Sequence, residues 1–233
     1  MEEALPPFMR LGGIMVKGVL FDMDGTMLDS EPVSESCWMK AAEELGYTIE
    51  KDLMNSFFGK NLVSIQNMLA EALGIGEKAS DIVAGRQKYY SAYIRENVMP
   101  KKKGLVELLE YLKEKNIPAV VCTSTETELG EIALKNAGVY DYFASHVFGD
   151  MVKHTKPDPE GFQMAAKAIG IPSEECLVIE DSPNGILAGK AAGGYTIFVP
   201  DRLVLPEEVR EGITTEVKSL DEIIEWIEQE NSK

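Results

Sequence analysis

Val19-Leu20-Phe21-Asp22-Met23-Asp24-Gly25-Thr26 is the stretch from which the fold can be predicted. Its first three residues are apolar, which predicts the end of a short buried strand. Asp22 and Asp24 follow two residues apart, and Gly25 ends the strand. Two carboxylates at the carboxyl end of a strand offer oxygen ligands for Mg²⁺, and also a nucleophile and an acid/base group. The alternative is an acidic surface turn, because Asp-Gly is frequent in hairpins.

The charge of the chain limits its partners. The 233 residues include 23 Lys and Arg and 39 Asp and Glu, which gives a formal net charge of −16. This balance argues against a nucleic acid or an anionic membrane surface as a partner. An anionic substrate must therefore be held by local positive groups or by a metal ion.

Cysteine and histidine content points to a reducing compartment and away from zinc. Cys37, Cys122 and Cys176 are widely spaced, which predicts buried free thiols and a cytoplasmic location. His146 and His154 are the two histidines, too few for a histidine-based zinc site. Residues 1–13 lack a secretory apolar segment, and we expect residues 1–14 to be a tail or to result from an upstream start. Apolar runs of the length that spans a membrane are missing from the sequence.

Strand and helix patterns alternate along most of the chain. Apolar strand patterns occur near residues 16–21, 117–122, 146–148, 177–179 and 196–199, with amphipathic helices between them. This order predicts an α/β fold, a parallel sheet with helices on both faces. Residues 33–98 show helical patterns alone, so we expect an all-helical cap over residues 32–98, inserted into a core of residues 1–31 and 99–233. Its hinges are predicted near residues 30–32 and 98–100.

Polar groups follow the predicted strands of the core. Thr123-Ser124-Thr125, Lys156-Pro157 and Glu180-Asp181 come after the second, third and fourth core strands. Each has an ordinary interpretation, as a helix N-cap, a surface lysine and an acidic loop. Ligands of such sheets bind at the carboxyl ends of the strands, where all these groups would gather with Asp22 and Asp24. Together they predict a Mg²⁺ site with hydroxyl and ammonium partners for a phosphate.

In these motifs the chain resembles the haloacid dehalogenase-like superfamily. The helical insert is similar to the small cap of its β-phosphoglucomutase and phosphoglycolate phosphatase group. The resemblance implies a Rossmann-like three-layer core and phosphoryl transfer through an aspartyl-phosphate. It also implies that Asp22 is the nucleophile and a metal ligand, and that Asp24 is the general acid/base and gives the metal its backbone carbonyl.

The remaining motif residues receive roles from the same resemblance. Thr123, Ser124 and Gly25 are expected to bind the transferring phosphate, and Lys156 to neutralise its charge. Asp181 is expected to be the direct Mg²⁺ ligand, with Glu180 acting through metal-bound water.

Cap residues indicate the branch of the superfamily. Mutases of this group carry a histidine where this chain has Ser34 and an arginine where it has Leu62. We therefore expect a phosphatase that hydrolyses a small phosphorylated metabolite, with a sugar phosphate as the favoured class. The alternatives are a β-phosphoglucomutase and a catalytically silent binding or regulatory protein.

The cap is also expected to choose the substrate. The resemblance implies that Lys60 and Asn61 contact the substrate beyond its phosphate, with Arg86 and Lys88 as further candidates. The protein is expected to be a monomer or a small homo-oligomer.

Overall fold

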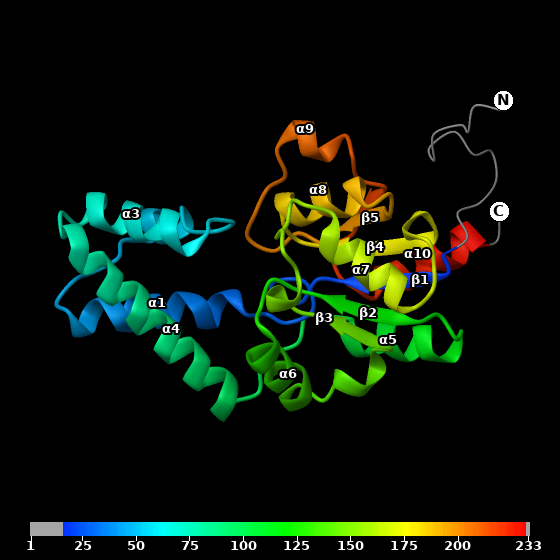
Figure 1. Ribbon diagram of the computed structural model, residues 1–233, viewed down its shortest axis with the longest axis horizontal. Coiled ribbons are helices and arrows are strands. Elements are labelled where there is room, and N and C mark those ends of the chain that lie inside the picture. Colours follow the sequence, from blue (N-terminus) through cyan, green and yellow to red (C-terminus); the bar gives the residue numbers. More distant parts are fainter. Residues whose placement is uncertain (1–15, 232–233) are drawn as a thin grey trace.

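The computed structural model describes residues 16–231, and its centre is a six-stranded parallel sheet (Figure 1). The strand order is β3-β2-β1-β4-β5-β6. The strands are β1 (Gly18–Phe21), β2 (Ala119–Cys122), β3 (Ser145–Val147), β4 (Cys176–Glu180), β5 (Tyr195–Phe198) and β6 (Thr215–Glu216). The predicted α/β fold with a parallel, Rossmann-like sheet is confirmed.

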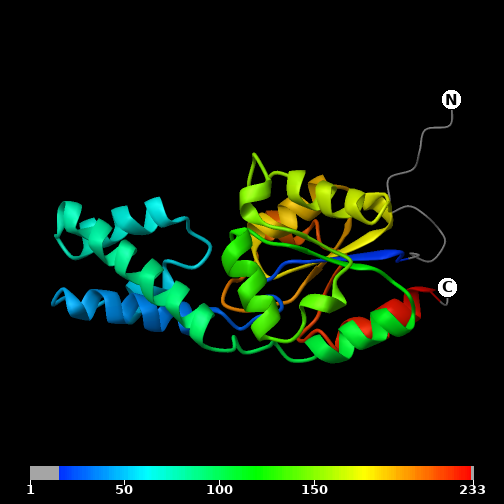
Figure 2. The same ribbon diagram turned by 60° about the horizontal axis from the view of Figure 1, so that its bottom comes forward.

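Both faces of the sheet are buried because successive residues of a strand point to opposite sides. In β1, Val19 and Phe21 join one apolar cluster, while Leu20 joins the other. The first cluster also contains residues of α5 (Leu105–Glu114), α6 (Thr127–Asn136) and α10 (Glu222–Asn231). The second contains residues of α7 (Glu160–Ala168) and α8 (Pro183–Ala191). Figure 2 shows α5 and α10 below the sheet and the helices of the second group above it.

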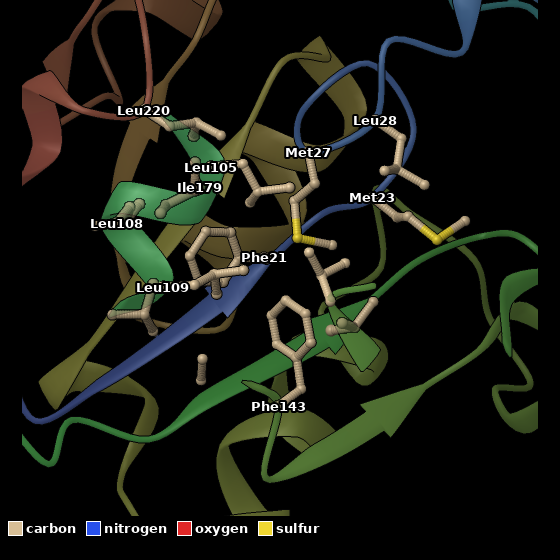
Figure 3. Packing of buried hydrophobic residues seen from close by; sticks show 14 of the residues in the cluster. Phe21, Met23, Met27, Leu28, Leu105, Leu108, Leu109, Phe143, Ile179 and Leu220 are labelled. Atoms are coloured by element: carbon tan, nitrogen blue, oxygen red, sulfur yellow. The ribbon is translucent and has the colours of Figure 1, made fainter. Parts of the chain in front are cut away.

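The first motif is fixed by apolar side chains on either side of its carboxylates. Phe21 packs edge-on against Phe143, with ring centroids 5.7 Å apart. Met23, Met27 and Leu28 are fully buried in the same cluster (Figure 3). The chain around Asp22 and Asp24 therefore has little freedom, which is what a site at the end of a strand requires.

Four helices lie between β1 and α5 in the sequence and to one side of the sheet (Figure 1). They are α1 (Glu31–Glu44), α2 (Lys51–Asn55), α3 (Leu62–Ala72) and α4 (Ala79–Glu96), with a 3₁₀ turn at Gly76–Lys78. We call residues 31–96 the helical insert. It has an apolar cluster of its own, in which Trp38 and Phe57 meet with ring centroids 5.4 Å apart. No strand occurs in it, as expected, whereas its status as a separate cap domain with boundaries at 31/32 and 98/99 stays a prediction.

The two chain segments that join the insert to the core run side by side. Asp29 N donates to Pro100 O at 2.8 Å, and Lys102 N donates to Met27 O at 2.9 Å. Leu28 and Lys101 form an antiparallel bridge. The two chain connections between the insert and the core are therefore held together by hydrogen bonds.

Some details differ from the sequence-based expectations. Strand β6 and the short helix α9 (Glu207–Arg210) were not predicted, because two and four residues carry too little periodicity. The three cysteines are buried and free, as expected. The expectation for residues 1–14 lies outside the described residues. Among residues 16–231 no helix has the length and apolar character needed to cross a membrane.

Candidate active site

Asp22 directly follows β1 at the carboxyl edge of the sheet. Its backbone N–H donates to Ile179 O of β4 at 3.0 Å, which continues the strand pairing by one residue. Its carboxylate is buried. Burial, reinforced by the charge of Glu180 and opposed by Lys156, raises the pKa of Asp22 to about 7.

Lys156 reaches this carboxylate from the loop between β3 and α7. Its ammonium group donates to Asp22 Oδ1 at 2.5 Å, to Glu180 Oε1 at 2.7 Å and to Cys122 O at 3.0 Å. Burial alone would lower the pKa of Lys156, but the charges of Asp22 and Glu180 raise it well above its ordinary value. Lys156 is thus a fixed cation at the site and not a surface lysine.

Glu180, the last residue of β4, is fully buried and has both carboxylate oxygens engaged. Oε1 accepts from Lys156, and Oε2 accepts from the backbone N–H groups of Asp181 and Ser182 and from Ser182 Oγ, at 2.9–3.0 Å. A carboxylate with protein partners on both oxygens is suited to orient its neighbours.

Asp181 contacts the end of the first motif, at Gly25 and Thr26. Its Oδ1 accepts a hydrogen bond from Thr26 Oγ1 at 2.9 Å. A Cβ atom on Gly25 would lie 2.3 Å from Asp181 Oδ2, and Gly25 has a φ of +82°. Glycine is therefore required here both by the backbone conformation and by the approach of the carboxylate. Burial and the charges of Glu180 and Asp22 raise the pKa of Asp181 well above its ordinary value.

The donor set fits Mg²⁺. Oxygen atoms of Asp22, Glu180 and Asp181 lie within 4.8 Å of one another. Three buried carboxylates face a single ammonium group, so the cluster has excess negative charge that a divalent cation would compensate. Among the described residues, no hydrogen bond is recorded to Oδ2 of Asp22 or of Asp181. This arrangement favours Asp181 over Glu180 as a direct ligand.

Asp24 is held by groups from two different parts of the chain. Its Oδ2 accepts from Thr125 Oγ1 at 2.7 Å and lies 3.5 Å from Thr123 Oγ1. Its Oδ1 accepts from the hydroxyl of Tyr90, in α4 of the insert, at 3.1 Å. The Asp24 carboxylate therefore sits at the junction of core and insert.

The hydroxyls after β2 do not act as a helix N-cap. The N-cap of α6 is Glu126, and Asp150 accepts from the backbone N–H of Thr127 at 3.0 Å instead. Thr123 is buried and its Oγ1 accepts from Thr125 N at 3.0 Å, while Ser124 is exposed. The structure thus places Thr123 beside Asp24, with Ser124 on the solvent side of the turn.

A cavity of about 140 Å³ lies in the helical insert. We call it the insert cavity. Its lining includes six apolar residues, four charged residues and two small residues. They are Trp38, Met54, Phe57, Phe58, Leu62 and Ile65; Glu31, Glu35, Lys60 and Arg86; and Ser34 and Gly59. Arg86 donates to Ser34 Oγ at 2.7 Å, and its guanidinium lies 4.2 Å from the centroid of the Tyr90 ring. Burial and the charges of Asp24 and Asp201 raise the pKa of Glu31 to about 7.

The cap residues named from sequence divide into two groups. Lys60 and Arg86 line the insert cavity. Asn61 does not: it is the N-cap of α3, and its side chain accepts from Ser64 N at 2.9 Å. Lys88 is exposed and also lies outside the lining.

Two contacts of the site were missed from sequence: Tyr90 and Thr26. Thr125 was expected among the hydroxyls after β2, but its bond to Asp24 was not. Thr26 belongs to the first motif, so its position was a signal that could have found it. Tyr90 had no such signal, because its contact with Asp24 depends on how the insert packs on the core.

Comparison with known proteins agrees with this geometry. The sequence profile of the family described as haloacid dehalogenase-like hydrolase matches residues 16–193. The chain is 31% identical over 187 residues to a phosphorylated carbohydrates phosphatase of Thermotoga maritima, covering 78% of this chain and 84% of that protein. It is 33% identical over 187 residues to hexitol phosphatase A of Escherichia coli, covering 78% and 82%.

Solved structures support the same relationship. A candidate β-phosphoglucomutase from Thermotoga maritima superimposes with a TM-score of 0.78 at 29% identity, covering 92% of this chain and 99% of that chain. The profile match spans both the motif residues and the helical insert. The chain therefore belongs to the haloacid dehalogenase-like hydrolases.

Proposed function

We propose that the protein is a Mg²⁺-dependent phosphatase that hydrolyses a small phosphorylated sugar through an aspartyl-phosphate on Asp22. The observation that supports this most directly is the grouping of Asp22, Glu180 and Asp181 around Lys156, with Asp24 beside them. The enzyme class, phosphoric monoester hydrolase, follows from the family and from relatives named as phosphatases.

Asp22 and Asp24 divide the chemistry between them. A carboxylate oxygen of Asp22 attacks phosphorus while the bond from phosphorus to the leaving oxygen breaks. Asp24 gives its proton to that oxygen, so that an alcohol departs. Asp24 then takes a proton from water, whose oxygen attacks phosphorus and releases phosphate from Asp22. Both aspartates return to their starting states.

The negative charges of nucleophile and phosphate must be compensated before attack. Lys156 supplies one positive charge, already in contact with Asp22. Mg²⁺, when bound, would supply the remaining charge compensation and orient the phosphate. Asp22, Asp181 and the backbone carbonyl of Asp24 are the groups that would hold it, with Glu180 acting indirectly. Gly25, Thr123 and Ser124 would contribute to phosphate binding.

The insert cavity is the proposed site for the leaving group. Its lining contains aromatic rings together with charged side chains that can donate or accept hydrogen bonds. Such a lining suits a hydroxyl-rich molecule. The named substrate types of the two phosphatase relatives, phosphorylated carbohydrates and hexitols, fit this chemistry.

A mutase is disfavoured by the residue at position 34. The mutases that the chain resembles carry a histidine at this position. Ser34 instead accepts a hydrogen bond from Arg86, and residues 33–100 contain no histidine. A silent binding protein is disfavoured because the full set of reacting residues is present.

Phosphate release from a substrate panel tests the proposal. Sorbitol 6-phosphate, fructose 1-phosphate, phosphoglycolate and p-nitrophenyl phosphate would be incubated with Mg²⁺ or with a chelator. We expect release with Mg²⁺ and none with the chelator. β-Glucose 1-phosphate with its 1,6-bisphosphate as primer should yield phosphate or remain unchanged. Full activity after chelation, or rapid conversion to glucose 6-phosphate, would contradict the proposal.

A further inference from the structure

A loop of the core, residues 200–206 between β5 and α9, reaches towards the helical insert (Figure 1). It leaves β5 at the carboxyl edge of the parallel sheet, the edge that also carries Asp22 and Asp181. None of its residues belongs to the motifs recognised from sequence. The loop nevertheless lies near both the candidate active site and the helical insert.

The loop contacts residues that line the insert cavity. Arg202 Nη2 lies 3.9 Å from Glu35 Oε1, and the Arg202 guanidinium carbon lies 5.9 Å from the centroid of the Phe58 ring. Leu203 Cδ1 lies 3.1 Å from the position that a Cβ atom would take on Gly59. Glu35, Phe58 and Gly59 are all lining residues of the cavity. The loop therefore packs against the wall of the insert cavity from the core side.

The base of the loop is fixed. Asp201 Oδ1 accepts from Lys102 Nζ at 2.6 Å, and the side chains are 9% and 18% exposed. Lys102 also lies 3.5 Å from Asp29, in the other connecting segment. Arg202 and Leu203 thus extend from an anchored residue.

Distance along α1 indicates how far a leaving group must extend to meet Arg202. Glu31 is near enough to Asp24 for the two charges to interact. Glu35 stands one helical turn farther along α1, about 6 Å from Glu31 at 1.5 Å per residue. Glu35, with which Arg202 pairs, therefore lies one turn beyond Glu31 along α1.

We propose that this loop completes the leaving-group site, that Arg202 is a specificity-determining residue, and that the substrates are phosphate monoesters of five- or six-carbon polyols or sugars. This inference rests on the proposed phosphatase function. The Arg202 side chain is 41% exposed and its pairing with Glu35 is long. Such a pair contributes little by itself, so the guanidinium is free to donate to substrate hydroxyls.

Two polyol phosphates of different length provide the test. Sorbitol 6-phosphate and glycerol 3-phosphate both release an uncharged polyol. We would measure kcat/KM for each and take the ratio in the unsubstituted protein, in Arg202→Ala and in Leu203→Ala. Arg210→Ala is the matched control, because Arg210 lies in α9 and pairs with Glu216 at 2.5 Å, apart from the cavity. Thermal unfolding would verify that each variant is folded.

We expect the unsubstituted protein to prefer the six-carbon substrate. Arg202→Ala removes a charged hydrogen-bond donor and should lower the ratio of kcat/KM for sorbitol 6-phosphate to that for glycerol 3-phosphate about tenfold. Leu203→Ala should also lower this ratio. Arg210→Ala should keep the original ratio. An unchanged ratio in Arg202→Ala, or a preference of the unsubstituted protein for glycerol 3-phosphate, would overturn this inference. Failure to release phosphate from either substrate and from p-nitrophenyl phosphate would instead contradict the phosphatase function itself.

Discussion

Gly25 shows how one residue can be required for two reasons. Its φ of +82° lies in the left-handed region, and a Cβ atom would meet the Asp181 carboxylate. Gly46 shares the first property, with a φ of +79°, but has no atom within 4 Å of the added Cβ. Substitution of the two glycines therefore separates the effect of backbone strain from the effect of displacing the Asp181 carboxylate.

Alanine substitutions at these positions should have different effects. We expect Gly46→Ala to lower the free energy of unfolding by about 1–2 kcal/mol through strain alone. Gly25→Ala should lower it further and weaken Mg²⁺ binding by about tenfold or more, because Asp181 must move. Chemical denaturation and Mg²⁺ titration measure the two quantities. Equal Mg²⁺ affinity in both variants would show that Asp181 does not hold the metal.

His146 should make stability depend on pH. Its ring stacks on Tyr140, with centroids 4.1 Å apart, and its Nε2 is buried without a hydrogen bond among the described residues. Burial lowers its pKa below the ordinary value of 6.5, opposed by Glu131 and Asp141 and assisted by Lys135. The unfolded chain therefore takes up the proton first as pH falls. Stability should be retained above about pH 6.5 and lost as pH decreases from there towards the folded pKa.

Thermal unfolding at pH 7 and pH 5 checks this effect. His146→Phe should lose less stability between the two pH values than the unsubstituted protein. A pH dependence that His146→Phe leaves unchanged would assign it to other groups.

At the scale of elements, the double connection between insert and core depends on Lys102. Its ammonium group joins Asp201 of the loop 200–206 to Asp29 of the other connecting segment. Asp201 Oδ2 is buried without a hydrogen bond among the described residues. Removing Lys102 would leave the Asp201 carboxylate largely uncompensated.

Replacement of neighbouring lysines tests this role. We expect Lys102→Met to lower the free energy of unfolding by about 2 kcal/mol. Lys101→Met should cost less, because the Lys101 ammonium donates to a single carbonyl, Ala137 O. Adding Asp201→Asn to Lys102→Met should restore part of the loss. Denaturant titration measures all three variants, and equal losses for Lys101→Met and Lys102→Met would contradict the role of Lys102.

The site contacts that could be predicted from sequence are those that follow from the order of the strands. Strands β1 and β4 are neighbouring apolar runs that end directly in acidic motifs, so the approach of Asp22 to Glu180 followed from topology. Lys156 joins them from the loop after β3. Contacts such as that between Tyr90 and Asp24 depend on how α4 packs against the core, which no local pattern encodes. Asn61 was expected to bind substrate because its loop faces the cleft in the family that the chain resembles, but its side chain caps α3.

Because the whole molecule has a net charge of −16, an anionic substrate needs positive charge close to its binding site. The cluster of Asp22, Glu180 and Asp181 lies in a chain that repels further anions, with Lys156 as its one contacting cation among the described residues. A bound divalent cation should therefore stabilise the folded state as well as permit substrate binding.

Mg²⁺ should raise the midpoint temperature of thermal unfolding, and the shift should increase with the Mg²⁺ concentration relative to its dissociation constant. At about 100 times the dissociation constant, the expected stabilisation is about 2.7 kcal/mol. Asp181→Asn should greatly reduce the shift, whereas Asp141→Asn, at an exposed site, should retain it. An Asp181→Asn protein with the full Mg²⁺ shift would place the metal elsewhere.

Detection of a phosphoryl group on Asp22 tests the central claim most directly. In Asp24→Asn, p-nitrophenyl phosphate can still transfer its phosphoryl group, because its leaving group needs little protonation, but water is no longer activated. After rapid acid quench and mass spectrometry of peptides, we expect one phosphoryl group on the peptide that contains Asp22. Asp22→Asn should show none and should release no phosphate. A phosphoryl group on another residue, or continued phosphate release by Asp22→Asn, would contradict the assignment of Asp22 as the nucleophile.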